Sequence, residues 1–115
     1  MMAYKRGEIV LVDFNPRKRA EEVAKVRPAI IVSDTDLNHV LDLVSVIALT
    51  TNLIDDAAPL RIRFAPRDRL QHPSDAMIEQ LRTVAKSRIG ERIASVSDEE
   101  MRQVEKGIGM MLGMG

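Results

Sequence analysis

The sequence predicts one small domain of the mainly β class that ends in a single α-helix, and three observations support this. The chain has 115 residues, 45% of them hydrophobic, which is enough for one compact core and too little for two. Runs rich in β-branched residues follow one another without alternating helices, which favours a small barrel or a strongly curved antiparallel sheet. A capping signal and an apolar stripe near the end of the chain indicate the helix.

The first two expected strands flank a charged segment. Residues 9–14 (IVLVDF) are rich in β-branched side chains and stop at Asn15-Pro16, because proline lacks the amide donor of a strand residue. Residues 17–26 are charged and lack strand alternation, so we expect a polar loop there. Arg27-Pro28 then opens the apolar run of residues 29–33, typical of a strand covered on both faces, with the proline at its start.

Further strands are expected in the middle of the chain. A turn or short helix over residues 34–40 precedes residues 43–50 (LVSVIALT), which indicate a third buried strand. In residues 60–64 (LRIRF) apolar and basic side chains alternate, so the apolar face should pack inward and the arginines should face outward. A fifth strand is expected from about Ala76 to Val84.

The C-terminal helix is expected to begin at Ser97. Ser97 and Glu100 have the capping-box spacing, in which the serine accepts from a first-turn amide and the glutamate reaches back to the serine amide. We expect the apolar stripe of this helix to pack on the sheet rather than to hold a cofactor or a membrane, with part of it available for a dimer contact. The stripe consists of Met101, Val104, Ile108, Met111 and Leu112.

Composition excludes several kinds of site. The chain has no cysteine, which removes disulfides, thiolate catalysis and cysteine-based zinc sites and fits a reducing compartment. The two histidines, His39 and His72, lack the spacing of a histidine-built metal site, so we expect no metal and no other cofactor. No stretch resembles a signal peptide or a membrane span, so we expect a soluble, cytoplasmic protein.

Charge is balanced over the whole chain but not locally. The formal net charge is zero, which argues against a protein that coats nucleic acid through bulk positive charge. Basic residues nevertheless outnumber acidic ones between Lys5 and Arg27, and four arginines gather in residues 61–69. Both regions are candidates for attracting an acidic partner.

Four segments of the chain stand in the order and at the spacings found in the MazF/PemK/Kid toxins. They are GEIVLV (7–12), VRPAIIV (26–32), ALTT (48–51) and EQLRT (79–83), and residues 86–112 also look like that family. The resemblance covers nearly the whole chain. It implies an SH3-like β-barrel of the CcdB/PemK/MazF type with a C-terminal helix, a two-fold homodimer, and a sequence-selective endoribonuclease toxin that cleaves single-stranded RNA in the dimer groove.

The family ties cleavage to the arginine of its R-P motif and to the threonine that ends the third strand, and these roles fall on Arg27 and Thr50. Attack of a ribose 2′-hydroxyl on the neighbouring phosphate builds negative charge, which a guanidinium can bind through two oxygens while a hydroxyl donates to a third. Arginine is hard to deprotonate, so Arg27 is expected to stabilise charge or protonate the leaving oxygen. The chemistry therefore agrees with the resemblance.

The general base stays open between two carboxylates. Glu22 matches the acidic residue of the family's first loop and could accept the 2′-hydroxyl proton, and Glu79 is the second candidate. In the Kid branch an aspartate at the Glu79 position follows an arginine two residues earlier, but this chain has Met77 there. Many relatives have glycines in this loop, where this chain has residues 23–25 (VAK), so the loop should be stiffer here. The RNA sequence at which the protein cuts therefore stays open.

The resemblance also implies which side chains meet the RNA. The residues expected to line the groove are Lys25, Pro28, Thr51, Glu79, Gln80, Arg82 and Thr83. With one tyrosine and two phenylalanines in the chain, hydrogen bonding rather than stacking should read most of the bases. A small acidic antitoxin, with a disordered tail over the basic groove, is the expected protein partner, and any contact with operator DNA would run through it.

Two other functions fit a barrel of this type. CcdB-like proteins poison DNA gyrase through a C-terminal helix, but they lack the R-P and threonine pair and end in a tail with tryptophan, a residue absent here. A catalytically silent RNA-binding or autoregulatory module is the second alternative, because a fold does not determine an activity.

Overall fold

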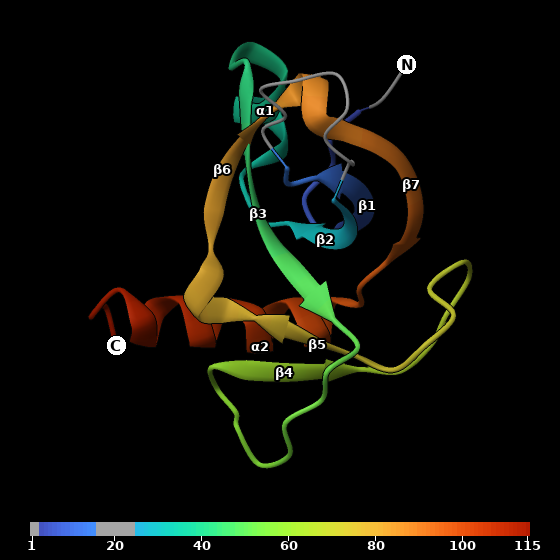
Figure 1. Cartoon of the computed structure of the whole chain (residues 1–115). Helices are drawn as coiled ribbons and strands as arrows, with labels where there is room; N and C mark the ends of the chain where they lie inside the picture. Colours follow the sequence, from blue (N-terminus) through green and yellow to red (C-terminus); the bar gives the residue numbers. More distant parts are fainter. Residues whose placement is uncertain (1–2, 16–24) are drawn as a thin grey trace.

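The computed structural model describes residues 3–15 and 25–115 (Figure 1). The expected polar loop over residues 17–26 lies almost entirely outside these ranges. In chain order the described elements are β1 (Glu8–Asp13), β2 (Val26–Ile31), α1 (Thr35–Val40), β3 (Leu43–Thr50), β4 (Arg61–Phe64), β5 (Ser74–Met77), the 3₁₀-helix η1 (Ile78–Gln80), β6 (Arg82–Ala85), the 3₁₀-helix η2 (Lys86–Arg88), β7 (Ile89–Ser95) and α2 (Asp98–Met111).

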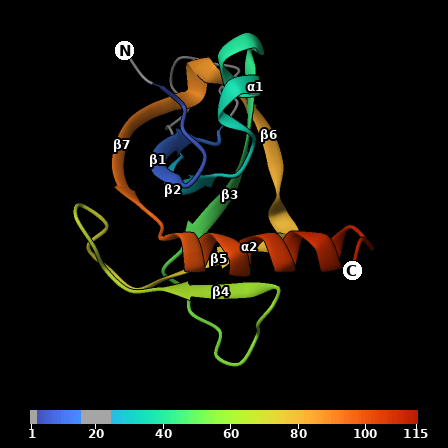
Figure 2. The same ribbon diagram turned by 180° about the vertical axis from the view of Figure 1, so that it is seen from behind.

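The strands form one antiparallel sheet whose two parts share β3. The order is β4-β5-β3-β2-β1-β7, and β6 pairs with β3 beside this path. The start of β3 pairs with β6 and its end pairs with β5, so β3 links the large curved part of the sheet to the small part formed with β4 and β5 (Figures 1 and 2). The mainly β fold with a C-terminal helix is confirmed. Among the described strands β6 and β7 do not pair, so the sheet curves strongly without closing into a full barrel.

Side chains alternate along the strands and fill two cores, one on each face of the sheet. Ile9 and Ile30 belong to the core that also contains Met101 and Val104 of α2. The expectation that the apolar runs form strands covered on both faces is therefore confirmed. The core on the other face consists of Val10, Val12, Ala29, Ile31, Val44, Val46, Val84 and Ile89.

The C-terminal helix begins where its capping signal predicts. The Glu100 N–H donates to Ser97 Oγ at 3.1 Å, and the Ser97 N–H donates to Glu100 Oε1 at 2.8 Å. The stripe packs on the sheet at its start, whereas Leu112 at its end is 55% exposed. Within residues 3–15 and 25–115 no helix has the length and hydropathy needed to cross a membrane.

The structure corrects the predicted strands in three places. The single strand expected over Ala76–Val84 is divided into β5, η1 and β6, because β5 and β6 pair with opposite ends of β3 and the chain must turn between them. Strand β7 was not expected, since its ladder with β1 contains register shifts that break the apolar alternation. Strand β2 begins two residues before Pro28, and β2 pairs with β3 only from Ala29 on, so the missing proline amide interrupts no bond to β3.

Candidate functional site

Arg27 and Thr50 lie at the same level of neighbouring strands and on the same face. Ala29 of β2 pairs with Ala48 of β3, and continuing this antiparallel register by two residues brings Arg27 opposite Thr50. Because side chains two residues apart share a face of a strand, Arg27 and Thr50 lie on the side of Ala29 and Ala48. Strand register thus puts on one face the two residues to which the resemblance assigns cleavage, although only Arg27 lines the hollow on that face.

A small hollow of about 90 Å³ opens on this face. Four residues expected to act on RNA line it: Lys25, Arg27, Gln80 and Arg82. The guanidinium carbon of Arg82 lies 5.1 Å from the centroid of the Phe14 ring, a cation–π contact that holds the arginine at the hollow. Phe14, Ala48 and Met77 complete the lining, so the hollow combines an apolar base with basic side chains.

Three described arginines pair with no described carboxylate, and two of them, Arg27 and Arg82, line the hollow. Arg88 donates to the backbone carbonyls of Asp13 and Asn15. With Lys25, the two guanidinium groups therefore concentrate positive charge at the hollow, where it can attract a phosphate. The arginines that do pair with carboxylates are Arg6, Arg61, Arg63, Arg67, Arg69, Arg92 and Arg102.

The arginines of residues 61–69, which are expected to attract an acidic partner, each pair with a carboxylate of this chain. Arg63 donates to the buried carboxylate of Asp75 at 2.9 Å and to Asp55 at 2.6 Å. Arg67 is bound in the same way by Glu100. These ion pairs lower the pKa values of Asp75 and Glu100 below their ordinary range. The positive charge of these arginines is therefore partly compensated within the chain.

Thr50 is positioned from two sides. Its Oγ1 accepts a hydrogen bond from the backbone N–H of Asn52 at 3.1 Å, which leaves the hydroxyl hydrogen able to donate elsewhere. Across the ladder, Thr50 pairs with Asp75 of β5. The Asp75 Oδ2 atom accepts from the backbone N–H of Ile54 at 2.8 Å, so the chain that follows Thr50 is tied to β5.

Other residues expected to meet RNA lie away from the hollow. Pro28 and Thr51 alternate with Arg27 and Thr50 along their strands, and they line a larger pocket on the opposite face of the sheet. Thr83 lies 3.1 Å from Ser45, hydroxyl oxygen to hydroxyl oxygen. Since Thr83 pairs with Ser45 and Arg82 pairs with Val46, Thr83 points to the face opposite Arg82.

Of the two candidates for the general base, the structure describes Glu79 but not Glu22. Glu79 does not line the hollow, and its Oε1 atom accepts from Arg61 Nε at 3.3 Å. Glu22 lies outside the described residues, so its role stays a prediction. Among the residues that are described, no group of three or more His, Cys, Asp or Glu side chains is placed to hold a metal ion.

Sequence reasoning missed two residues at this site. Phe14 supports Arg82, and its position after Val10 and Val12 in the alternation of β1 is the signal that would have placed it on this face. Arg88 fixes the end of β1 through the carbonyl oxygens of Asp13 and Asn15. No pattern in the sequence indicates that contact, because η2 and β1 are far apart along the chain.

Comparisons with known proteins agree with this fold. The endoribonuclease MazF of Staphylococcus saprophyticus is 28% identical over 111 residues, which cover 96% of this chain and 92% of that protein. A chain of the MazE–MazF crystal structure (form II) from Deinococcus radiodurans has a TM-score of 0.82 at 20% identity, with both chains covered completely. A mycobacterial endoribonuclease solved with its cognate antitoxin has a TM-score of 0.78 at 21% identity, with 96% of each chain covered.

These two solved structures establish the fold alone, because their sequences are only 20–21% identical to this chain. The family is established by a match between the sequence and a family model. Residues 5–112 match the family described as the PemK-like, MazF-like toxin of type II toxin–antitoxin systems. That match spans all four segments that carried the resemblance. The chain therefore belongs to the PemK-like, MazF-like toxins of type II toxin–antitoxin systems.

Proposed function

We propose that this chain is a sequence-selective, metal-independent endoribonuclease that cleaves single-stranded RNA as the toxin of a toxin–antitoxin pair. The observation that carries the proposal is the placement of Arg27 and Thr50 on one face of neighbouring strands, beside a hollow to which Lys25 and Arg82 add positive charge. The name of the S. saprophyticus relative supports the reaction class.

The proposed reaction is an internal transesterification. The ribose 2′-oxygen forms a bond to phosphorus while the bond from phosphorus to the 5′-oxygen breaks, which leaves a 2′,3′-cyclic phosphate and a 5′-hydroxyl. The 2′-hydroxyl proton passes to a base, and the leaving oxygen takes up a proton. Arg27 would bind two phosphate oxygens as negative charge develops, and Thr50 would donate to a third.

The chain's own cations can supply the charge stabilisation that a metal ion would otherwise give. A guanidinium has hydrogen-bond donors and no acceptor, so Arg27 is unsuited to be the base and acts instead as stabiliser of charge or as donor to the 5′-oxygen. Of the two carboxylates, Glu22 is the better candidate for the base, because Glu79 is ion-paired with Arg61 and does not line the hollow. Gln80 and Arg82 would contact the RNA beside the scissile phosphate.

Assembly and regulation follow the same proposal. We infer a homodimer in the cytoplasm, silenced by a small acidic antitoxin that covers the basic hollow and bridges the toxin to operator DNA. One solved neighbour is an endoribonuclease in complex with its cognate antitoxin and another is a MazE–MazF complex, which supports the partner. Met110, Leu112 and Met114 are between 49% and 79% exposed at the end of α2, and burial of these side chains between two copies would stabilise a dimer.

A cleavage assay on long single-stranded RNA tests the proposal. With EDTA present, the purified protein should cut at a small set of sequences, and each cut should leave a 2′,3′-cyclic phosphate on the upstream product and a 5′-hydroxyl on the downstream product. A substrate with a 2′-deoxy sugar at the scissile position should bind and resist cleavage, since it lacks the nucleophile. Cleavage that requires added magnesium, or that persists on the 2′-deoxy substrate, would reject this mechanism. Tight RNA binding without cleavage would identify the silent RNA-binding module instead.

A further inference from the structure

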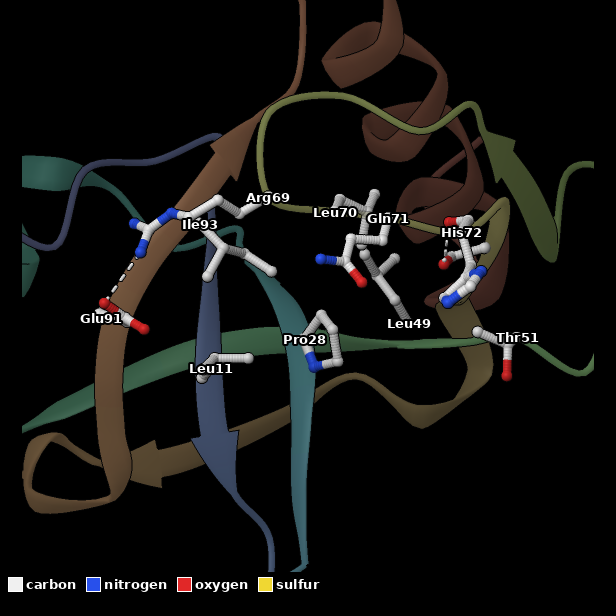
Figure 3. A pocket seen from close by; sticks show the side chains of 11 residues that line it. Leu11, Pro28, Leu49, Thr51, Arg69, Leu70, Gln71, His72, Glu91 and Ile93 are labelled. Carbon is white, nitrogen blue, oxygen red and sulfur yellow. Dashed lines mark hydrogen bonds and ion pairs between the residues drawn. The ribbon is translucent and has the colours of Figure 1, made fainter.

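The face of the sheet opposite Arg27 carries a pocket of about 460 Å³, within the size range of small-molecule sites. The loop between β4 and β5 covers one side of it, and β1, β2, β3 and β7 form the rest (Figure 3). The apolar floor consists of Leu11, Pro28, Leu49, Leu70 and Ile93. This pocket has no part in the reaction described above.

The polar groups of the pocket are mostly neutral. Arg69 and Glu91 lie at one end and bind each other at 3.0 Å, so their charges are compensated (Figure 3). Thr51 and His72 lie at the other end, with Gln71 between the two ends. The side chains of Thr51, Gln71 and His72 form no hydrogen bond to any other residue in the described part of the chain, so all three can serve a ligand.

The pocket is joined to the cleavage residues through the backbone. Pro28 follows Arg27 and Thr51 follows Thr50, and consecutive Cα atoms are about 3.8 Å apart. The β2–β3 ladder ends at Ala29 and Ala48, and the next residue of each strand on that side, Pro28 and Leu49, lines the pocket. An RNA strand that crosses this end of β2 and β3 can therefore place its phosphate at Arg27 and a neighbouring nucleotide on the other face.

We propose that this pocket binds an unpaired nucleobase that flanks the scissile phosphate and that Gln71 and His72 read its edge. The inference rests on the proposed ribonuclease function. A base has apolar faces and an edge of neutral donors and acceptors, which match an apolar floor with amide, hydroxyl and imidazole groups at its margin. A phosphate or an acidic peptide would need an unpaired cation here, and the arginine of the pocket is already held by Glu91.

The experiment compares cleavage profiles on a pool of single-stranded RNA with random sequence, read by sequencing the cut ends. The test variants are Gln71→Ala and His72→Ala, both at exposed positions where the fold should survive. The matched controls are Gln103→Ala on α2 and His39→Ala on α1, which remove the same side chains away from the pocket. Thermal melts of all variants check that folding is unchanged.

Both test variants should still cleave RNA. At one position beside the cut, their preference for one base over the others should be about tenfold weaker than in the wild-type protein, which corresponds to the loss of one hydrogen bond. The controls should keep the wild-type profile. If wild-type protein cuts the pool and both test variants show its profile unchanged, the inference is wrong and the proposed function stands. If wild-type protein cuts no RNA, the proposed function fails and the inference fails with it.

The remaining alternative is that a segment of the antitoxin occupies the pocket, and a measurement of how well the antitoxin inhibits each variant tests it. If Gln71→Ala and His72→Ala keep the cleavage profile but need far more antitoxin for inhibition, the pocket binds an antitoxin segment and the nucleobase assignment is overturned. If the profile changes and neutralisation does not, the nucleobase assignment is supported.

Discussion

Asp75 of β5 is the cross-strand partner of Thr50 of β3, and its side chain, only 1% exposed, carries a carboxylate in the interior of the small part of the sheet. Arg63 binds this carboxylate from β4, and the backbone N–H of Ile54 binds it from the segment that follows Thr50. A single buried group thus connects β4, β5 and the chain leaving the candidate site.

Replacement of Asp75 by asparagine should reduce the free energy of unfolding by about 2 kcal/mol, because hydrogen bonds to a charged group are lost and Arg63 remains without its partner. Urea denaturation of the wild-type protein and of Asp75→Asn measures the loss. The matched control is Asp42→Asn, whose exposed side chain makes no bond to another described residue. Equal stability of the two variants would show that the ion pair contributes nothing.

Stability should also fall at acid pH. Arg63 holds the pKa of Asp75 below its ordinary value, and Arg67 does the same for Glu100. A carboxyl group with a lower pKa in the folded state contributes stability above its unfolded pKa, about 4, and this contribution is lost as the pH falls toward the folded pKa. Urea midpoints measured from about pH 6 to about pH 3 should therefore decline below about pH 5.

The Asp75→Asn variant provides the control for that decline. Since it lacks one of the two carboxyl groups, its stability should fall less steeply with acidification than that of the wild-type protein. Parallel curves for the two proteins would mean that Asp75 has the same pKa in the folded and unfolded states.

Arg27→Ala should reduce the single-turnover cleavage rate by about two orders of magnitude, since removal of one stabiliser of developing charge typically has an effect of that size. Thr50→Ala should have a smaller effect, because a neutral hydroxyl forms a weaker hydrogen bond than a guanidinium. Arg102→Ala is the matched control, since Arg102 is exposed on α2 and pairs with Glu99. Cleavage by Arg27→Ala at the wild-type rate would exclude the proposed role of this residue.

The affinity for an uncleavable 2′-deoxy substrate should decrease as the salt concentration rises, with a modest slope because the net charge is zero. Arg82→Ala should lower that slope by about 0.7, the value for one phosphate contact on a single strand. Lys106→Ala on α2 should leave it unchanged. Affinities measured by fluorescence anisotropy at several salt concentrations give the slopes, and equal slopes for all three proteins would remove Arg82 from the RNA surface.

Two glycines of α2 should respond in opposite directions to alanine. A Cβ atom on Gly107 would clash with the carbonyl oxygen of Pro59, so Gly107→Ala should destabilise the protein by about 1–3 kcal/mol through overpacking. At Gly109 nothing lies within 4 Å, and alanine there should stabilise the helix by about 0.5–1 kcal/mol. Thermal melts of both variants measure the effects, and a stable Gly107→Ala would show that α2 can move away from Pro59.

The sequence by itself determined the elements whose signals are local. The run LVSVIALT became β3 with the expected bounds, and the capping box at Ser97 and Glu100 marked the start of α2. Four motifs in register were enough to predict the toxin family, because a residue type at a fixed spacing is a property of the chain alone. The types of residue at the candidate site were likewise visible in the sequence.

Only the tertiary structure decided how these residues are grouped. The alternation of β2 and β3 sends Arg27 to one face and Pro28 to the other, so a set of residues that looked like one RNA surface is divided between a basic hollow and an apolar pocket. The arginines of residues 61–69 looked available until the fold brought distant carboxylates to them. Pairing across strands depends on register and on long-range contacts, and neither is encoded in the local pattern that a sequence shows.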